Sequence, residues 1–244
     1  MPRIVTYNVH RCVGNDRQLD VTRVAEVLAR LEPDIVGLQE LDVGRARTNH
    51  VDQANEIAER LEMAVHFHPA MRVEKELYGD AILSAYPEKL IQTGPLPGHP
   101  RLTALEPRGA LWLEVDIDGK AVQVINTHLG LVPREQQTQA AFLAGPSWLG
   151  HPRCQAPKIL LGDFNATGTS VVYRTLTARL EPARRLAPER KPTSTFPSQL
   201  PVLRIDHIFV SPDIVVRDVF APFDPLTRVA SDHLPLVMDF DLAG

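Results

Sequence analysis

The chain has 244 residues, 44% of them hydrophobic, which is enough to bury the core of one globular domain spanning residues 1–244. Its 26 Lys and Arg against 30 Asp and Glu give a net charge of −4, which argues against a protein that grips long nucleic acids through charge. Only 2 cysteines occur, and no apolar run approaches the roughly 20 residues of a bilayer span, so the composition excludes a disulfide framework, a zinc cluster and a transmembrane helix.

Apolar runs and amphipathic patterns alternate in the first quarter of the chain. Asp20 is placed to cap a helix that Pro33 would stop. The next apolar run would deliver Glu40 at its C-terminal end. In order, the predicted elements are a buried strand at 3–9, a helix at 21–31, a buried strand at 34–39 and a second amphipathic helix at 52–61.

The middle of the chain contains the clearest hairpin signal. Alternating apolar and polar residues surround Asp118-Gly119, a dipeptide typical of a tight turn, and His128 follows the second arm. Residues 71–80 have the character of a loop that could approach a ligand, and the proline-rich residues 94–107 predict an ordered surface loop. The predicted strands of this part are 65–67, 81–84, 110–117 and 121–126.

The remainder of the chain combines the same two kinds of pattern. Residues 180–201 are rich in proline and basic residues and predict irregular structure. The last two predicted strands carry Asp206 and His233 at their edges. The predicted elements are a helix at 134–143, a strand at 158–161, a helix at 170–180 and strands at 204–210 and 234–240. Helices alternating with strands, together with an antiparallel hairpin, favour an α/β fold with mixed sheets.

Acidic, amide and imidazole side chains recur at or just beyond the predicted strands. They lie in the segments TYNVH, LQE, NTHL, GDFN and SDH. One sheet edge could therefore bring all of these segments together. Carboxylate oxygens suit Mg²⁺, and imidazoles can move protons and offset charge on a phosphorane-like transition state. This coincidence predicts a metal-dependent site that cleaves phosphate esters.

The acidic residues also have plainer interpretations. Glu40 follows an apolar run, where a charge either faces a cleft or cation or lies at an exposed strand end. Asp163 and Asn165 are two residues apart, so in an extended segment both would point into one pocket. The alternative is a turn held by hydrogen bonds from their own side chains.

The histidines are ambiguous in the same way. His128 near an apolar run could be a satisfied core histidine. His233 has Asp232 beside it and Asp206 on another strand end, and a carboxylate behind a histidine fixes its tautomer and raises its basicity. Surface ion pairs are the alternative for either carboxylate.

The ordered motifs resemble those of a known family. TYNVH, LQE, GDAILS, NTHL, GDFN, RIDHIF and SDHLP, running from residue 3 to about residue 240, are similar to the motifs of the endonuclease/exonuclease/phosphatase superfamily. That superfamily includes DNase I-like nucleases, abasic-site endonucleases, inositol-polyphosphate phosphatases and neutral sphingomyelinases. The resemblance implies a four-layered α/β/β/α sandwich of two mixed sheets, with the site at one edge.

The resemblance also implies a role for each motif residue. The implied metal residues are Glu40 as the principal Mg²⁺ ligand, Asn8 as a ligand or orienting amide, and Asp232, with Mn²⁺ as a substitute ion. The implied catalytic residues are Asp163, which positions or deprotonates water, Asn165, which holds water or a phosphate oxygen, His233 with Asp206 at the scissile phosphate, and His128 on the leaving-group side. Arg108 is a weaker match to a phosphate-contacting arginine. His10 stands where abasic-site endonucleases carry an acid, and it either contacts substrate phosphate or packs.

These residues predict a Mg²⁺-dependent phosphodiesterase, because two histidines allow a poor alkoxide leaving group to be protonated. The substrate of such a phosphodiesterase could be a nucleic acid, a phospholipid headgroup or a small ester. The alternative functions are a phosphomonoesterase and a catalytically inactive binding protein on the same fold. Basic residues between Arg179 and Lys191 could steer a polyanion, contact an anionic lipid surface or form a solvated loop. Reduced Cys12 and Cys154, with Asn8 where a leader would lie, predict a cytoplasmic location.

Overall fold

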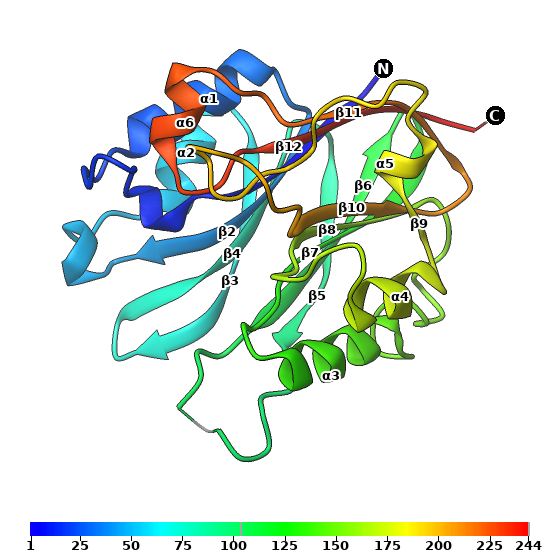
Figure 1. Cartoon of the computed structure of the whole chain (residues 1–244), viewed down its shortest axis with the longest axis horizontal. Helices are drawn as coiled ribbons and strands as arrows, with labels where there is room; N and C mark the ends of the chain where they lie inside the picture. Colours follow the sequence, from blue (N-terminus) through cyan, green and yellow to red (C-terminus); the bar gives the residue numbers. More distant parts are fainter. Residues whose placement is uncertain (103, 244) are drawn as a thin grey trace.

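The computed structural model describes residues 1–102 and 104–243 and contains two six-stranded mixed sheets packed against each other (Figure 1). The first sheet has the order β11 (Ile214–Phe220), β12 (Leu236–Leu242), β1 (Arg3–Asn8), β2 (Ile35–Val43), β4 (Glu76–Ser84), β3 (Ala64–Val73). The second has the order β5 (Glu88–Pro95), β6 (Gly109–Ile117), β7 (Lys120–His128), β8 (Lys158–Asp163), β10 (Asp206–Val210), β9 (Glu181–Pro182).

Helices cover the outer face of each sheet (Figure 1). On the first sheet lie α1 (Val21–Leu31), α2 (Gln53–Leu61) and α6 (Pro225–Ala230). On the second lie α3 (Pro133–Ala144) and α4 (Val171–Thr177), while α5 (Ala183–Leu186) packs beside β10 and β11. The predicted four-layered α/β/β/α sandwich is therefore confirmed. No helix formed by the described residues is long and apolar enough to cross a membrane.

Alternating side chains on the strands build these layers. On β1, Ile4 points into the core between the two sheets, whereas Val5 and Tyr7 join the core under α1 and α2. On β6, Leu111 faces the core between the sheets and Trp112 packs under α3. Successive side chains of a strand point to opposite faces, so each central strand is buried on both sides. This double burial explains why the predicted strands read as nearly continuous apolar runs.

Each sheet contains one parallel pair of strands, and both pairs end at the same rim. In the first sheet β1 runs parallel to β2, with Asn8 opposite Gln39. In the second sheet β7 runs parallel to β8, with His128 opposite Asp163. Because the carboxyl ends of parallel strands carry their polar residues to one edge, the motifs from both sheets meet there.

The elements with strong local signals are confirmed. Asp20 caps α1 and accepts a hydrogen bond of 2.8 Å from the backbone N–H of Arg23. The β6–β7 hairpin turns at Asp118 and Gly119, both with positive φ (53° and 83°), as a tight primed turn requires.

Several predicted boundaries were wrong. Residues 71–80 are not a loop, because β3 and β4 extend to Val73 and Glu76 and pair there as an edge hairpin whose polar residues face solvent. The predicted loop at 94–107 overlaps β5, and β11 and α6 carried no recognised signal. Within residues 180–201, β9 and α5 are short regular elements. Finally, β2 continues to Val43, so Glu40 lies inside the strand and not at its end.

Candidate active site

Asn8, at the end of β1, connects the polar residues of the two sheets. Its side-chain Nδ2 donates to Glu40 Oε1 and to Asp163 Oδ2, both at 3.0 Å, while its Oδ1 accepts from the backbone N–H of His10 at 3.0 Å. Asn8 is buried, and its backbone carbonyl accepts from Ser231 Oγ at 2.8 Å. The amide is therefore fixed from three sides. In this arrangement Asn8 orients the two carboxylates.

Glu40 reaches the rim through an irregularity in β2. The β2–β4 register shifts between Leu38 and Leu41, and Glu40 adopts a left-handed φ of 61°. A residue other than glycine costs about 1 to 3 kcal/mol in this conformation, which persists only where its surroundings enforce it. The bulge turns the Glu40 carboxylate toward Asn8 and leaves it half-buried. The apolar run around Glu40 did not indicate this bulge.

Asp80 is a site residue that sequence reasoning missed. It is buried on β4 opposite the Glu40 bulge. Burial raises the pKa of Asp80 to about 8, although Arg108 and the backbone N–H of Glu40 lower it. The motif GDAILS contains Asp80, so the signal was present without an assigned role.

In the second sheet, strand pairing places two carboxylates side by side. Asp163 ends β8 and Asp206 begins the neighbouring antiparallel strand β10, where the two residues are direct partners. Burial and the charge of Asp206 raise the pKa of Asp163 to about 7, although His233 and hydrogen bonds from Asn165 and Asn8 lower it. Asp163 is thus a carboxyl group that can exchange a proton near neutral pH.

His233 and Asp206 form a buried pair. His233 Nδ1 lies 2.9 Å from Asp206 Oδ2, and His233 Nε2 lies 3.7 Å from Asp163 Oδ2. Burial alone would lower the pKa of His233, but Asp206 and Asp163 raise it to about 10. His233 therefore carries a proton at neutral pH. Thr195, which no motif indicated, also donates to Asp206 Oδ2.

His128 lies between two hydrogen-bond donors. Its Nδ1 is 3.0 Å from Arg108 NH1, and its Nε2 is 3.1 Å from Asn165 Nδ2 and 3.6 Å from Asp163 Oδ2. Burial, Arg108 and His233 hold the pKa of His128 well below its usual 6.5. His128 is consequently a neutral imidazole. Its Nδ1 accepts from the guanidinium, so its hydrogen is on Nε2, and Asn165 Nδ2 donates to Leu129 O at 3.0 Å and not to that N–H. Arg108 is itself buried and pairs with Glu106 at 2.6 Å.

The two interpretations of GDFN are both correct. The backbone N–H of Asn165 donates to Asp163 Oδ1 at 2.8 Å, which is the side-chain turn, and Asn165 has a left-handed φ of 48°. The side chains of Asp163 and Asn165 nevertheless both reach His128. The chain could not hold Asp163 opposite His128 without Gly162, where a Cβ would lie 1.9 Å from Thr127 O.

His10 and Asp232 lie at the outer margin of the cluster. His10 Nδ1 is 3.9 Å from Asp232 Oδ1 and 3.2 Å from Val13 O, and its Nε2 accepts from Arg11 at 2.7 Å. Both side chains are about one-third exposed, at 31% for His10 and 36% for Asp232. These two residues are open to solvent, unlike the buried carboxylates behind them.

A buried amide pair joins the two sheets beneath the site. Gln39 Nε2 donates to Asn126 Oδ1 at 2.7 Å, and Asn126 Nδ2 donates at 2.9 Å to the carbonyls of Leu38 and Ala81. Both amides are fully buried. They belong to the motifs LQE and NTHL but had no assigned role. This link fixes the separation of Glu40 from His128.

Two groups of side chains could hold a divalent ion. Asp163, Asp206 and His233 offer ligand atoms within 4.8 Å of one another, but His233 Nδ1 and Asp206 Oδ2 are already bonded to each other. The half-buried Glu40 carboxylate uses only Oε1, for Asn8, among the described hydrogen bonds. Mg²⁺ takes oxygen ligands and keeps several waters, which suits a carboxylate open to solvent. The Glu40 side of the cluster therefore fits Mg²⁺ best.

The fold and the cluster define the class of protein. The four-layered sandwich of two mixed sheets matches the DNase I-like fold, and its carboxylates, amides and two histidines lie at one rim. Residues 5–233 match the model of the Endonuclease/Exonuclease/phosphatase family, and the chain belongs to this family. Members of the family are generally phosphoester hydrolases that use divalent metal ions.

Individual relatives cover nearly the whole chain. Escherichia coli YbhP is 26% identical over 251 residues, covering 98% of this chain and 96% of YbhP. An endonuclease/exonuclease/phosphatase from Bacteroides vulgatus superposes with a TM-score of 0.79 at 22% identity, covering 99% and 98% of the two chains. A mannosyl-6-phosphatase from Bacteroides thetaiotaomicron gives 0.72 at 20% identity, covering 99% and 100%. The two solved structures establish the shared fold.

Proposed function

We propose that this chain is a Mg²⁺-dependent phosphodiesterase that directs water onto phosphorus. One observation carries the proposal: Asp163 Oδ2 lies 3.0 Å from Asn8 Nδ2, 3.6 Å from His128 Nε2 and 3.7 Å from His233 Nε2. A single carboxylate oxygen thus adjoins the amide that binds Glu40 and both imidazoles. This is the arrangement that water activation beside a phosphate requires.

The residues around Asp163 divide the chemistry. Asp163 accepts a proton as the water oxygen bonds to phosphorus, and a pKa near 7 suits this role. His233, protonated and held by Asp206, donates a proton to the leaving oxygen as the bond from phosphorus to that oxygen breaks. We propose that neutral His128 donates its Nε2 hydrogen to a phosphate oxygen, a role different from the leaving-group role that the resemblance implies.

Glu40 would hold the metal ion, with Asp232 as a further carboxylate and Asn8 orienting both Glu40 and Asp163. Bound Mg²⁺ supplies positive charge against the phosphate oxygens and makes a coordinated water more acidic. Arg108, which is bound to Glu106 and His128, and the outlying His10 are the proposed contacts for substrate phosphate. Nucleic acid, a phospholipid-type ester and a small soluble diester are the substrate classes to compare.

The test is hydrolysis of bis(4-nitrophenyl) phosphate with Mg²⁺, with Mn²⁺ and with a chelator. We expect turnover with either ion and none after chelation. A signal only from 4-nitrophenyl phosphate would favour the phosphomonoesterase alternative, and no metal-dependent signal from either ester would favour a binding protein. A panel of DNA, RNA, phospholipids and inositol phosphates would then define the substrate class.

A further inference from the structure

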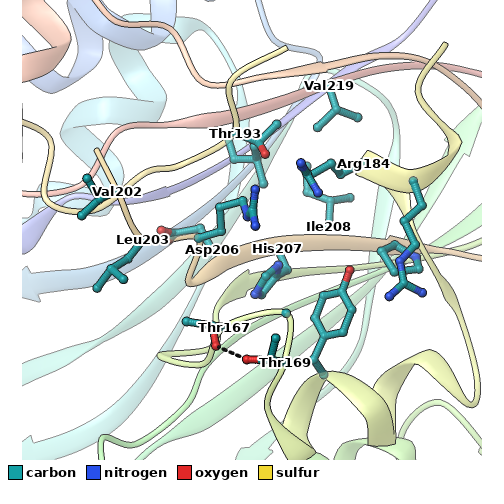
Figure 2. A pocket seen from close by; sticks show the side chains of 16 residues that line it. Thr167, Thr169, Arg184, Thr193, Val202, Leu203, Asp206, His207, Ile208 and Val219 are labelled. Atoms are coloured by element: carbon teal, nitrogen blue, oxygen red, sulfur yellow. Dashed lines mark hydrogen bonds between the residues drawn. The ribbon is translucent and has the colours of Figure 1, made fainter. Parts of the chain in front are cut away.

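A second polar pocket adjoins the proposed active site through Asp206. It has a volume of about 260 Å³ and lies between the segment that follows GDFN, α5 and the start of β10. Figure 2 shows Thr193 and Arg184 on one side of it, Thr167 and Thr169 on the other, and Asp206 and His207 between them. Asp206 lines this pocket and also binds His233, so β10 carries residues of both sites.

Three arginines at this pocket have no acidic partner. Arg184, Arg185 and Arg204 line it, and none of them takes part in an ion pair within residues 1–102 and 104–243. Arg185 instead lies over the ring of Tyr173, at 5.3 Å from its centroid. Burial and the neighbouring Arg204, Arg190 and Arg185 lower the pKa of Arg184. An anion placed among these like charges would relieve their repulsion.

A buried hydroxyl group supplies an independent sign of a ligand. Thr193 lines the pocket and is only 5% exposed, yet its Oγ1 has no hydrogen-bonding partner in the part of the chain that the structure describes. A buried polar atom without a partner destabilises the folded chain, and a hydrogen bond to a ligand oxygen would offset this loss. His207 on the floor adds no charge, because its Nε2 bonds to Ala166 O at 2.7 Å and burial lowers its pKa to about 4.

The size and lining of the pocket limit what it can hold. Its volume is below the ~300 Å³ at which ligand pockets usually begin, so it suits one small group and not a polymer. Val202, Leu203 and Tyr173 provide apolar surface beside the arginines. Guanidinium groups bind the oxygens of phosphate in a forked geometry. We propose that this pocket binds the phosphate group of a small organic phosphate.

This site is distinct from the proposed catalytic cluster and does not depend on hydrolysis. Asp206 Oδ2 is bound by His233 and Thr195, whereas its buried Oδ1 has no partner among the described residues. The three arginines that line the pocket outweigh the single negative charge of Asp206, so an anion can still bind here. Binding can therefore be measured without metal and without turnover. If no phosphate binding were measured, the proposed phosphodiesterase activity would still stand. If no hydrolysis were measured, the proposed phosphate site would still stand.

The experiment is calorimetric titration of the whole chain with phenyl phosphate and with inorganic phosphate, in metal-depleted buffer at about 0.15 M ionic strength. We expect binding of both, tighter for phenyl phosphate because its ring meets the apolar wall. The double variant Arg184→Gln/Arg204→Gln should bind at least tenfold more weakly. Arg179→Gln, which removes a nearby arginine outside the pocket, should bind as the unmodified chain does.

Two further variants separate this site from the active site and from misfolding. His128→Ala removes a proposed phosphate contact of the active site without touching the residues of this pocket, so it should keep the affinity. Arg184→Lys/Arg204→Lys should show an intermediate affinity because the charge stays without the forked geometry. The proposal is overturned if the unmodified chain binds neither probe. It is equally overturned if the glutamine double variant binds normally, or if His128→Ala alone abolishes binding.

Discussion

The two sheets contribute different chemistry to one rim. The first sheet supplies Asn8, Glu40 and Asp80, which are oxygen-bearing groups without an imidazole among them. The second supplies His128 and Asp163, together with Asp206, and all three are almost completely buried. The first sheet thus presents a partly open carboxylate suited to a cation, and the second presents groups suited to proton transfer.

His233 links the residues of the first sheet to those of the second. It precedes β12, a strand of the first sheet, yet its Nδ1 binds Asp206 on the second. Asn8 makes the reciprocal link, from β1 to Asp163. Metal binding and proton transfer should therefore respond separately to mutation, although Asn8 and His233 each bind a carboxylate of the second sheet.

The largest effect should come from the second sheet. We expect His233→Ala and Asp163→Ala each to reduce kcat by about 10² to 10³, because each loses a group worth about 3 to 4 kcal/mol in the transition state. Steady-state hydrolysis of bis(4-nitrophenyl) phosphate measures this, with His50→Ala, an exposed histidine, as the control. More than a tenth of the activity remaining in both variants, folded by circular dichroism, would refute the assignment.

Glu40→Gln tests the first sheet. The amide keeps the size of Glu40 but loses its charge, so we expect the Mg²⁺ concentration for half-maximal activity to rise at least tenfold, on the order of the loss seen when metal sites are disturbed. Residual activity in His233→Ala should show an unchanged Mg²⁺ requirement. Glu26→Gln, on the exposed face of α1, is the matched control. If Glu40→Gln and His233→Ala raised the Mg²⁺ concentration for half-maximal activity equally, metal binding could not be assigned to the first sheet alone.

Asp206→Asn should change the pH profile. Asp163 must be deprotonated and His233 protonated, so kcat/KM should rise through pH 7 and fall near pH 10. Asp206 raises the pKa of His233, and removing its charge should move the alkaline limb down by about one pH unit or more. An alkaline limb that stays in place would show that His233 is not the group titrating there.

The smallest effect is expected at Asp80, on stability. The folded chain keeps the Asp80 carboxyl protonated up to about pH 8, whereas the unfolded chain ionises near 3.8. Between these values the unfolded state binds fewer protons, so this group lowers stability as the pH rises. Asp80→Asn removes the titration, and we expect its Tm to exceed that of the unmodified chain by a margin that grows from pH 4 to pH 8. A constant margin would contradict the raised pKa.

The sequence predicts the parts of the fold that local signals determine. The cap at Asp20, the turn at Asp118-Gly119 and the doubly buried strands all follow from side-chain chemistry or periodicity. The predicted strands at 65–67 and 81–84 lie within β3 and β4, but the hairpin that joins them was missed because its polar, exposed residues resemble a loop. The edge strand β11 has the apolar sequence IVVRDVF, a signal that was visible but unused. α6 begins at Pro225 after Asp224, a capping signal that was visible but unused.

For the site, the sequence predicted which residues take part better than it predicted how they are arranged in space. Glu40 and Asp163 were both named, and the structure brings them together through Asn8. The left-handed bulge at Glu40 depends on pairing with β4, and the bond from Thr195 to Asp206 depends on how residues 187–205 fold back. Neither has a local signature, because each is set by a partner distant in the chain.

The placement of β12 links enzymatic competence to the completion of folding. β12 lies between β1 and β11, and His233 immediately precedes it. Until this strand docks, β1 has an open edge, Asp206 lacks its imidazole and Asn8 lacks the hydroxyl that holds its carbonyl. The proposed site is therefore incomplete until β12 docks, and appearance of the proposed hydrolysis during refolding would report this docking step.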